Sequence, residues 1–143
     1  MSRENIEIVE RMCAAYEAGD WEAATASLHP DIEWDVTGID WPDAEVFRGR
    51  EAVVKFFRRF LGTWEDYYVT FDEFTEVSDD HVVVSVRDGG RGKQSGAEVE
   101  REWAQLWTVR DGRAVAFRGF HDRASALAAA ASRARRSGAA PRP

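Results

Sequence analysis

Four consecutive segments in the second half of the chain constrain its fold more than any other feature of the sequence. They are rich in β-branched and aromatic residues, and they cover residues 67–77, 81–87, 98–109 and 113–121. Polar or glycine-containing stretches separate them, a pattern that predicts β-strands joined by turns. Such connections favour successive antiparallel hairpins. The longest stretch, residues 88–97 (DGGRGKQSGA), is interpreted as a mobile hairpin tip.

The remaining segments predict helices and one further strand. Apolar residues recur at steps of three and four over residues 3–18 and 51–61, which is the pattern of a helix with one buried face. A shorter helix is expected at residues 21–28, and an alanine-rich helix at residues 122–136. After the second helix, Ile32, Trp34 and Val36 alternate with acidic residues, which indicates a strand with two unlike faces.

The order of these elements predicts an α+β fold. We expect a cone-shaped barrel in which the three helices of the N-terminal half pack on a strongly curved antiparallel sheet, with a short C-terminal helix. The length of 143 residues suits one domain. We assign this domain to residues 1–132 and interpret residues 133–143, which contain four arginines and no acidic residue, as a flexible basic tail.

The charge and the cysteine content exclude several classes of partner. The formal net charge of -7 argues against binding to nucleic acid or to an anionic membrane surface. No apolar run approaches the roughly 20 residues of a membrane span, and the N-terminal segment lacks a signal-peptide core. The lone Cys13 cannot form an internal disulfide, and the three histidines lack the spacing of a metal site. We therefore expect a cytoplasmic protein that holds no metal.

Three stretches of the sequence carry a resemblance to a known family: YEAGDWEAATASLHPDIEWDV, FRGREAVVKFFRRF and LWTVRDGRAVAFRGFHDRASALAAA. With the element order, they resemble the SnoaL-like branch of the nuclear transport factor two superfamily, which includes ketosteroid isomerase and polyketide cyclases. The resemblance covers nearly the whole chain. It implies an apolar pocket for a small molecule, a homodimer formed through the sheet, and no metal or organic cofactor.

The resemblance also implies a catalytic group. Asp35 stands three residues before Gly38, as the catalytic aspartate of ketosteroid isomerase precedes a glycine, so Asp35 is the candidate general base. Tyr16 or Gln105 is the candidate hydrogen-bond donor to a developing oxyanion. The alternative is that Asp35 is a solvent-facing strand residue, since Asp31 and Glu33 share its face.

Large side chains are the candidates for a substrate-binding surface. Trp103, Gln105 and Trp107 share one face of a strand, which either lines the pocket or forms the dimer interface. The full set of candidate substrate-binding residues is Trp34, Trp41, Phe57, Trp103, Trp107, Phe117 and His121. The sequence therefore favours a cofactor-independent enzyme with isomerase or cyclase chemistry on a small apolar carbonyl or cyclic metabolite. The alternative is a non-catalytic small-molecule-binding or dimerisation module of the same fold.

Overall fold

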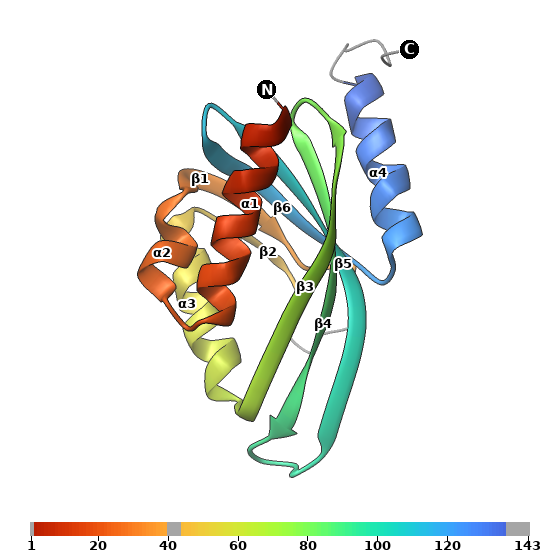
Figure 1. Ribbon diagram of the computed structural model, residues 1–143. Helices are drawn as coiled ribbons and strands as arrows, with labels where there is room; N and C mark the ends of the chain where they lie inside the picture. The colour runs from red at the N-terminus through yellow and green to blue at the C-terminus, as the bar shows by residue number, and fades with distance from the viewer. Residues whose placement is uncertain (1, 40–43, 137–143) are drawn as a thin grey trace.

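The computed structural model describes residues 2–39 and 44–136 and contains helices and strands in the predicted order (Figure 1). The helices are α1 (Ser2–Glu17), α2 (Trp21–Ala26), α3 (Arg50–Gly62) and α4 (Arg123–Arg136). The strands are β1 (Leu28–Asp35), β2 (Val46–Arg48), β3 (Trp64–Ser78), β4 (His81–Gly92), β5 (Glu98–Arg110) and β6 (Arg113–Phe120). They form one sheet in the order β2-β1-β6-β5-β4-β3.

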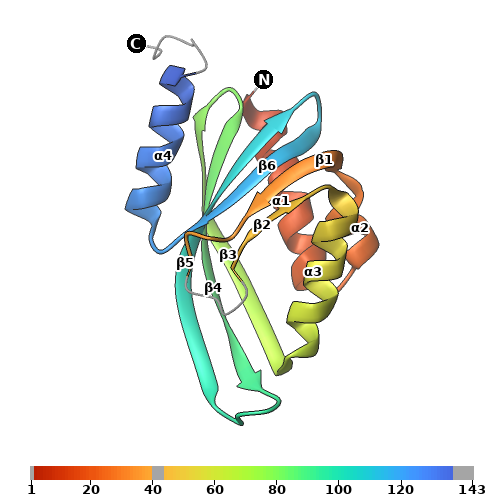
Figure 2. The ribbon, with the colours of Figure 1, turned by 180° about the vertical axis from the view of Figure 1, so that it is seen from behind.

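The sheet is strongly curved and does not close into a complete barrel. Helices α1, α2 and α3 cover its concave side, and α4 lies on the opposite side, as the two views in Figures 1 and 2 show. The α+β fold class is confirmed. Among the described helices, none is long and apolar enough to cross a membrane.

Two details differ from the expectation. Strand β1 pairs with β6 in parallel, so the sheet is mixed and not purely antiparallel. The short strand β2 pairs with β1 and was not recognised in the sequence, because three residues carry too weak a pattern. Helix α4 ends at Arg136, the residue at which the sequence predicts the end of the alanine-rich helix.

The first half of the glycine-rich stretch is strand, so the hairpin tip is shorter than expected. Strand β4 continues to Gly92, and only residues 93–97 form the turn. Within this stretch Asp88 pairs with Arg101 of β5, and Gly89 pairs with Tyr68 of β3. A Cβ atom at Gly89 would lie 2.3 Å from the carbonyl oxygen of Val99, so close strand contact explains this glycine. Asp88 is consequently inside the sheet.

Both faces of the central strand β5 are buried. Trp103 and Trp107 belong to the main core, on the side covered by α1, α2 and α3. Leu106 belongs to a second cluster, which includes Ala126 and Ala130 of α4. The small side chains of α4 allow the helix to approach the sheet closely. This arrangement resolves the alternative left open by the sequence, since the tryptophan face lies under the helices.

Side chains anchor the helices to the sheet. Asn5 of α1 donates a hydrogen bond of 2.6 Å from Nδ2 to the carbonyl oxygen of Asp79 in the β3–β4 turn. Arg50 of α3 donates from Nε to the carbonyl oxygen of Leu28 at 3.0 Å. Arg123 of α4 donates from Nη1 to the hydroxyl of Ser85 at 3.0 Å. The contacts of Asn5 and Arg50 fix two helices that cover the concave side, and the contact of Arg123 fixes α4 on the opposite side.

The close approach of the turn after β1 to strand β6 generates a testable prediction at Gly38. A Cβ atom there would lie 2.3 Å from the carbonyl oxygen of Gly119, which is too short for any real contact. We expect Gly38→Ala to lower the free energy of unfolding by about 1–3 kcal/mol, the usual effect of overpacking. The matched control is Gly62→Ala in helix α3, where nothing lies within 4 Å of the added methyl group. Equal urea midpoints for the two variants would contradict the packing described here.

Candidate functional site

A cavity lies between the concave side of the sheet and helices α1, α2 and α3. Its volume is about 40 Å³, and ten of its sixteen lining residues are aromatic. The lining residues are Met12, Cys13, Tyr16, Ala24, Leu28, Trp34, Phe56, Phe57, Phe60, Tyr67, Val69, Phe71, Trp103, Gln105, Trp107 and Phe117. An aromatic lining of this kind suits flat apolar molecules.

The structure brings together most of the residues that the sequence singled out. Those that line the cavity are Tyr16, Trp34, Phe57, Trp103, Gln105, Trp107 and Phe117. Asp35 and His121 lie elsewhere, and Trp41 lies outside the described residues. The cavity therefore contains two of the three candidate catalytic residues, without the candidate base.

Three aromatic rings from neighbouring strands form one wall of the cavity. Trp34 of β1 is paired with Phe117 of β6, which is paired with Trp107 of β5. The rings of Trp34 and Phe117 stack with centroids 3.8 Å apart and planes 12° apart. The ring of Trp107 meets Phe117 edge-on at 4.9 Å. The edge-on contact of Trp107 has a geometry that aromatic pairs prefer, and together with the close stacking of Trp34 on Phe117 it holds the wall in a defined shape.

Asp35 is on the outer face of the sheet, contrary to the expectation that it projects into the cavity. Successive strand side chains point to opposite faces, so the inward position of Trp34 directs Asp35 outward. Its Oδ1 accepts hydrogen bonds from the backbone N–H and the hydroxyl of Thr37, at 2.9 and 2.6 Å. Its Oδ2 lies 3.9 Å from Nε of Arg118. Asp35 is thus on the outer face, as in the alternative interpretation, although its side chain is only 19% exposed.

His121 is exposed at the junction of β6 and α4, away from the cavity lining. The next residue, Asp122, accepts a hydrogen bond of 2.8 Å at Oδ1 from the backbone N–H of Ser125. This bond, typical of a helix N-cap, holds the pKa of the Asp122 carboxyl below its usual range. His121 therefore belongs to a helix start, and the prediction that it lines the substrate pocket is not supported by its position.

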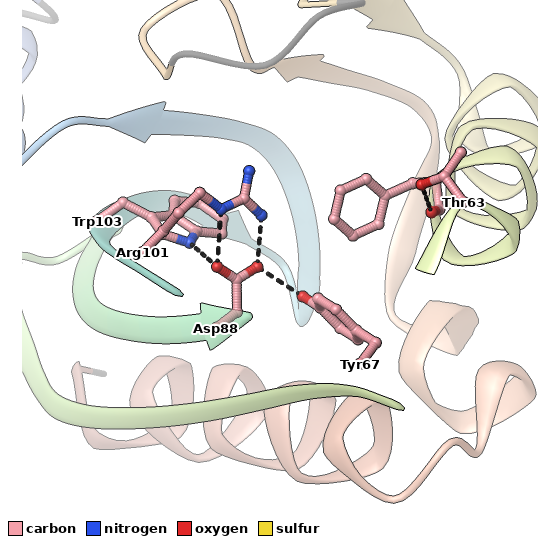
Figure 3. Close-up of polar contacts among 6 residues, drawn as sticks. Thr63, Tyr67, Asp88, Arg101 and Trp103 are labelled. Carbon is pink, nitrogen blue, oxygen red and sulfur yellow. Dashed lines mark hydrogen bonds and ion pairs between the residues drawn. The ribbon is translucent and has the colours of Figure 1, made fainter. Parts of the chain in front are cut away.

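A buried polar cluster lies beside the cavity, centred on the carboxylate of Asp88 (Figure 3). Asp88 is 0% exposed. Its Oδ2 accepts hydrogen bonds from the hydroxyl of Tyr67 at 2.7 Å and from Nη2 of Arg101 at 2.8 Å. Its Oδ1 accepts from Nε of Arg101 at 3.1 Å and from the indole N–H of Trp103 at 3.2 Å. Since Tyr67 and Trp103 line the cavity, Asp88 fixes the orientation of two lining residues.

Sequence analysis missed Asp88 because the neighbouring glycines suggested a turn. A usable signal was present nonetheless. Val82, Val84 and Val86 are buried members of the main core, at alternate positions of β4. Asp88 continues that series by two residues, so the same alternation places it on the cavity side. An acidic residue at the end of an inward-facing valine series is the pattern that indicates a buried carboxylate.

Neighbouring tyrosines supply neutral hydrogen-bond donors. Burial raises the pKa of Tyr16 above its ordinary range, and a hydrogen bond with the Tyr67 hydroxyl offsets part of this effect. Burial also raises the pKa of Tyr67, and the nearby Tyr16 and Asp88 raise it further. Both phenols therefore keep their protons at neutral pH. Tyr67 donates to Asp88, which leaves its oxygen to interact with Tyr16.

The orientation of the Gln105 amide follows from its contact with Trp107. The indole N–H of Trp107 can only donate, and it lies 2.9 Å from Oε1 of Gln105, which must therefore be the carbonyl end of the side chain. Gln105 is buried and lines the cavity. Its remaining end is the NH₂ group, another donor.

Cys13 also lines the cavity. Burial raises the pKa of its thiol, and Glu17 and Glu10 add to the effect, so the thiol stays protonated. This agrees with the packing role that its helical position indicates. Within residues 2–39 and 44–136, no three His, Cys, Asp or Glu side chains gather as a metal-binding group would.

The chain is similar to a set of known proteins. The sequence profile of the SnoaL-like domain matches residues 9–117. An NTF2-like protein from Burkholderia thailandensis E264 is 30% identical, with a TM-score of 0.76 over 90% of this chain and 96% of the other. An NTF2-like protein of unknown function from Burkholderia pseudomallei K96243 is 24% identical, with a TM-score of 0.73 over 87% and 95%.

A third similar structure, from Jannaschia sp. CCS1, is named for the SnoaL-like polyketide cyclases. It is 22% identical, with a TM-score of 0.71 over 83% of this chain and 85% of the other, which is a likeness of fold. No curated protein matches the chain by sequence.

The buried cluster generates a prediction about stability. Asp88→Ala removes the carboxylate and leaves Arg101, Trp103 and Tyr67 without the acceptor that they share. We expect the free energy of unfolding in urea to fall by about 3–5 kcal/mol, the usual cost of breaking a buried ion pair. Asp35→Ala is the matched control, and we expect it to cost less than about 1 kcal/mol because its ion pair is long and partly exposed. A cost for Asp88→Ala no greater than that of the control would refute the role of Asp88.

Proposed function

The chain belongs to the SnoaL-like family, and from this premise we propose that it binds a small, flat, apolar molecule that carries a carbonyl-type hydrogen-bond acceptor. The proposed site is the cavity under α1, α2 and α3, whose lining side chains must move apart to admit an aromatic ring, because its volume is about 40 Å³. The family hosts both enzymes and binding proteins, so the argument depends on the residues of the cavity and not on the fold.

The observation that carries this proposal is the combination of an aromatic lining with two neutral donors. Tyr16 offers a hydroxyl whose raised pKa keeps the proton in place, and Gln105 offers the NH₂ end of an amide oriented by Trp107. The Tyr16 hydroxyl already contacts the Tyr67 oxygen, whereas the indole N–H of Trp34, which also lines the cavity, has no hydrogen-bond partner among the described residues. A buried donor without a partner costs free energy, so a ligand with an acceptor atom is favoured over a hydrocarbon of the same shape. The rings of Trp34, Trp107 and Phe117 supply apolar contact around that acceptor.

A second candidate is acid–base catalysis on the same class of molecule, of the isomerase or cyclase type. The Tyr16 hydroxyl, supported by Tyr67 and Asp88, favours it because a fixed donor stabilises charge that develops on a carbonyl oxygen. This candidate needs a proton acceptor near the ligand, and Asp35 faces the other side of the sheet. Faster exchange of the methyl hydrogens of acetophenone for deuterium in D₂O in the presence of the protein distinguishes catalysis from binding.

The homodimer through the sheet stays a prediction, as does the cytoplasmic location. Helix α4 covers the outer face of the sheet around Val83, Leu106 and Phe120. A dimer through the sheet would therefore use the outer face of β2, β1 and β6. Ion pairs within the chain occupy part of that face, namely Glu33 with Arg48 and Asp35 with Arg118.

Binding of acetophenone, a flat molecule with one carbonyl, tests the proposal. We expect the intrinsic tryptophan fluorescence to be quenched on binding, because three tryptophans line the cavity. Tyr16→Phe and Gln105→Leu each remove one donor and should weaken binding by roughly 2- to 10-fold, the worth of one hydrogen bond.

Asp35→Asn is the control for this experiment and should leave the dissociation constant unchanged. Two results count against the proposal. One is the absence of saturable quenching by acetophenone in the wild-type protein. The other is a loss of affinity in Asp35→Asn as large as that in Tyr16→Phe.

A further inference from the structure

A groove on the outer surface runs between helices α2 and α3. Its volume is about 420 Å³. Trp21 of α2 and Val54, Phe57 and Leu61 of α3 form its apolar part. Trp21 is 43% exposed, which is unusual for so large an apolar side chain. The groove thus presents apolar surface to solvent between two short helices.

The groove and the cavity share one side chain. Phe57 lines both of them. On the cavity side its ring meets Trp34 edge-on, with centroids 5.2 Å apart, and it contacts Tyr16 at 5.3 Å. Tyr16 in turn meets Trp21 of the groove at 5.2 Å. A partition only one ring thick, made by Phe57 next to Tyr16, therefore separates the two spaces.

The volumes of the cavity and the groove indicate that the two spaces could hold one ligand together. A cavity of about 40 Å³ has room for roughly three water molecules, whereas small-molecule sites usually measure roughly 300–1,000 Å³. The groove supplies the missing volume directly beyond Phe57. Rotation of the Phe57 side chain to another rotamer would remove a ring that lines both spaces.

We propose that the cavity and the groove form one two-part site with Phe57 as its movable partition. The ligand is an elongated molecule with a flat, carbonyl-bearing head in the cavity and an apolar tail in the groove. The placement of the head depends on the function proposed above. Val54, Phe57 and Leu61 lie at positions i, i+3 and i+7 of α3, on one face of the helix. They offer the tail a path of roughly 10 Å, since a helix rises about 1.5 Å per residue.

A pair of ketones that share a head and differ in tail length tests this site. Hexanophenone has four methylenes more than acetophenone. Burial of each methylene should strengthen binding roughly three- to fourfold, so we expect hexanophenone to bind about a hundredfold more tightly than acetophenone. Tryptophan fluorescence reports both titrations. The ratio of the two dissociation constants measures the tail alone.

Leu61→Glu places a carboxylate in the path of the tail and should bring the ratio to within about fivefold of unity. Lys55→Glu is the matched control, because Lys55 is exposed on the same helix and does not line the groove. It should keep the ratio of the wild-type protein. Val54→Gln is a second groove variant, which replaces Leu61→Glu in this test if circular dichroism shows that Leu61→Glu does not fold. It should lower the ratio in the same direction.

The outcomes separate this inference from the function on which it rests. If neither ketone binds, the proposed function and the two-part site are both wrong. If acetophenone binds and the longer tail adds nothing, or the groove variants keep the full ratio, the two-part site is wrong and the cavity proposal stands. The two-part site is supported if the ratio of the two dissociation constants falls toward unity in the groove variants and stays at the wild-type value in Lys55→Glu.

Discussion

The alternation of side chains between the two faces of the curved sheet determines which residues can meet a ligand. In β1 the period of two sends Trp34 toward the helices and Asp35 away from them. In β5 it places Gln105 and Trp107 on the cavity side, while Leu106 packs under α4. In β4 it buries Asp88 in line with the valines that precede it. A shift of one residue in any of these strands would exchange the contents of the cavity with those of the outer face.

The buried carboxylate and the aromatic wall support each other. Burial of Asp88 is costly unless donors surround it, and Arg101, Trp103 and Tyr67 provide them. Two of these donors belong to residues of the cavity lining, so the interactions that satisfy the charge also fix the side chains that face a ligand. The tyrosine pair keeps its protons because the same burial raises both pKa values. Stability and the donor character of the cavity thus have a common origin.

The fold was largely predictable from the sequence, and the site only in part. Helical and strand periodicities are local, which is why most elements and the inward aromatic residues could be assigned. The parallel pairing of β1 with β6 joins distant segments and leaves no local pattern. Asp35 was assigned by counting residues to a glycine, whereas the pleat of β1 decides its face. Asp88 was missed because its glycine neighbours dominated the interpretation, although they lie in a paired strand.

The central claim is that the helix-covered face of the sheet, and not the face that carries Asp35, receives the ligand. A crystal structure of the protein with 4′-bromoacetophenone tests it directly, because the anomalous signal of bromine locates the molecule independently of any assumption about its pose. The account predicts a bromine peak among the rings of Trp34, Trp107 and Phe117, with the carbonyl oxygen within hydrogen-bonding distance of Tyr16 or Gln105. A peak on the outer face beside Asp35 and Arg118, with none in the cavity, would contradict it.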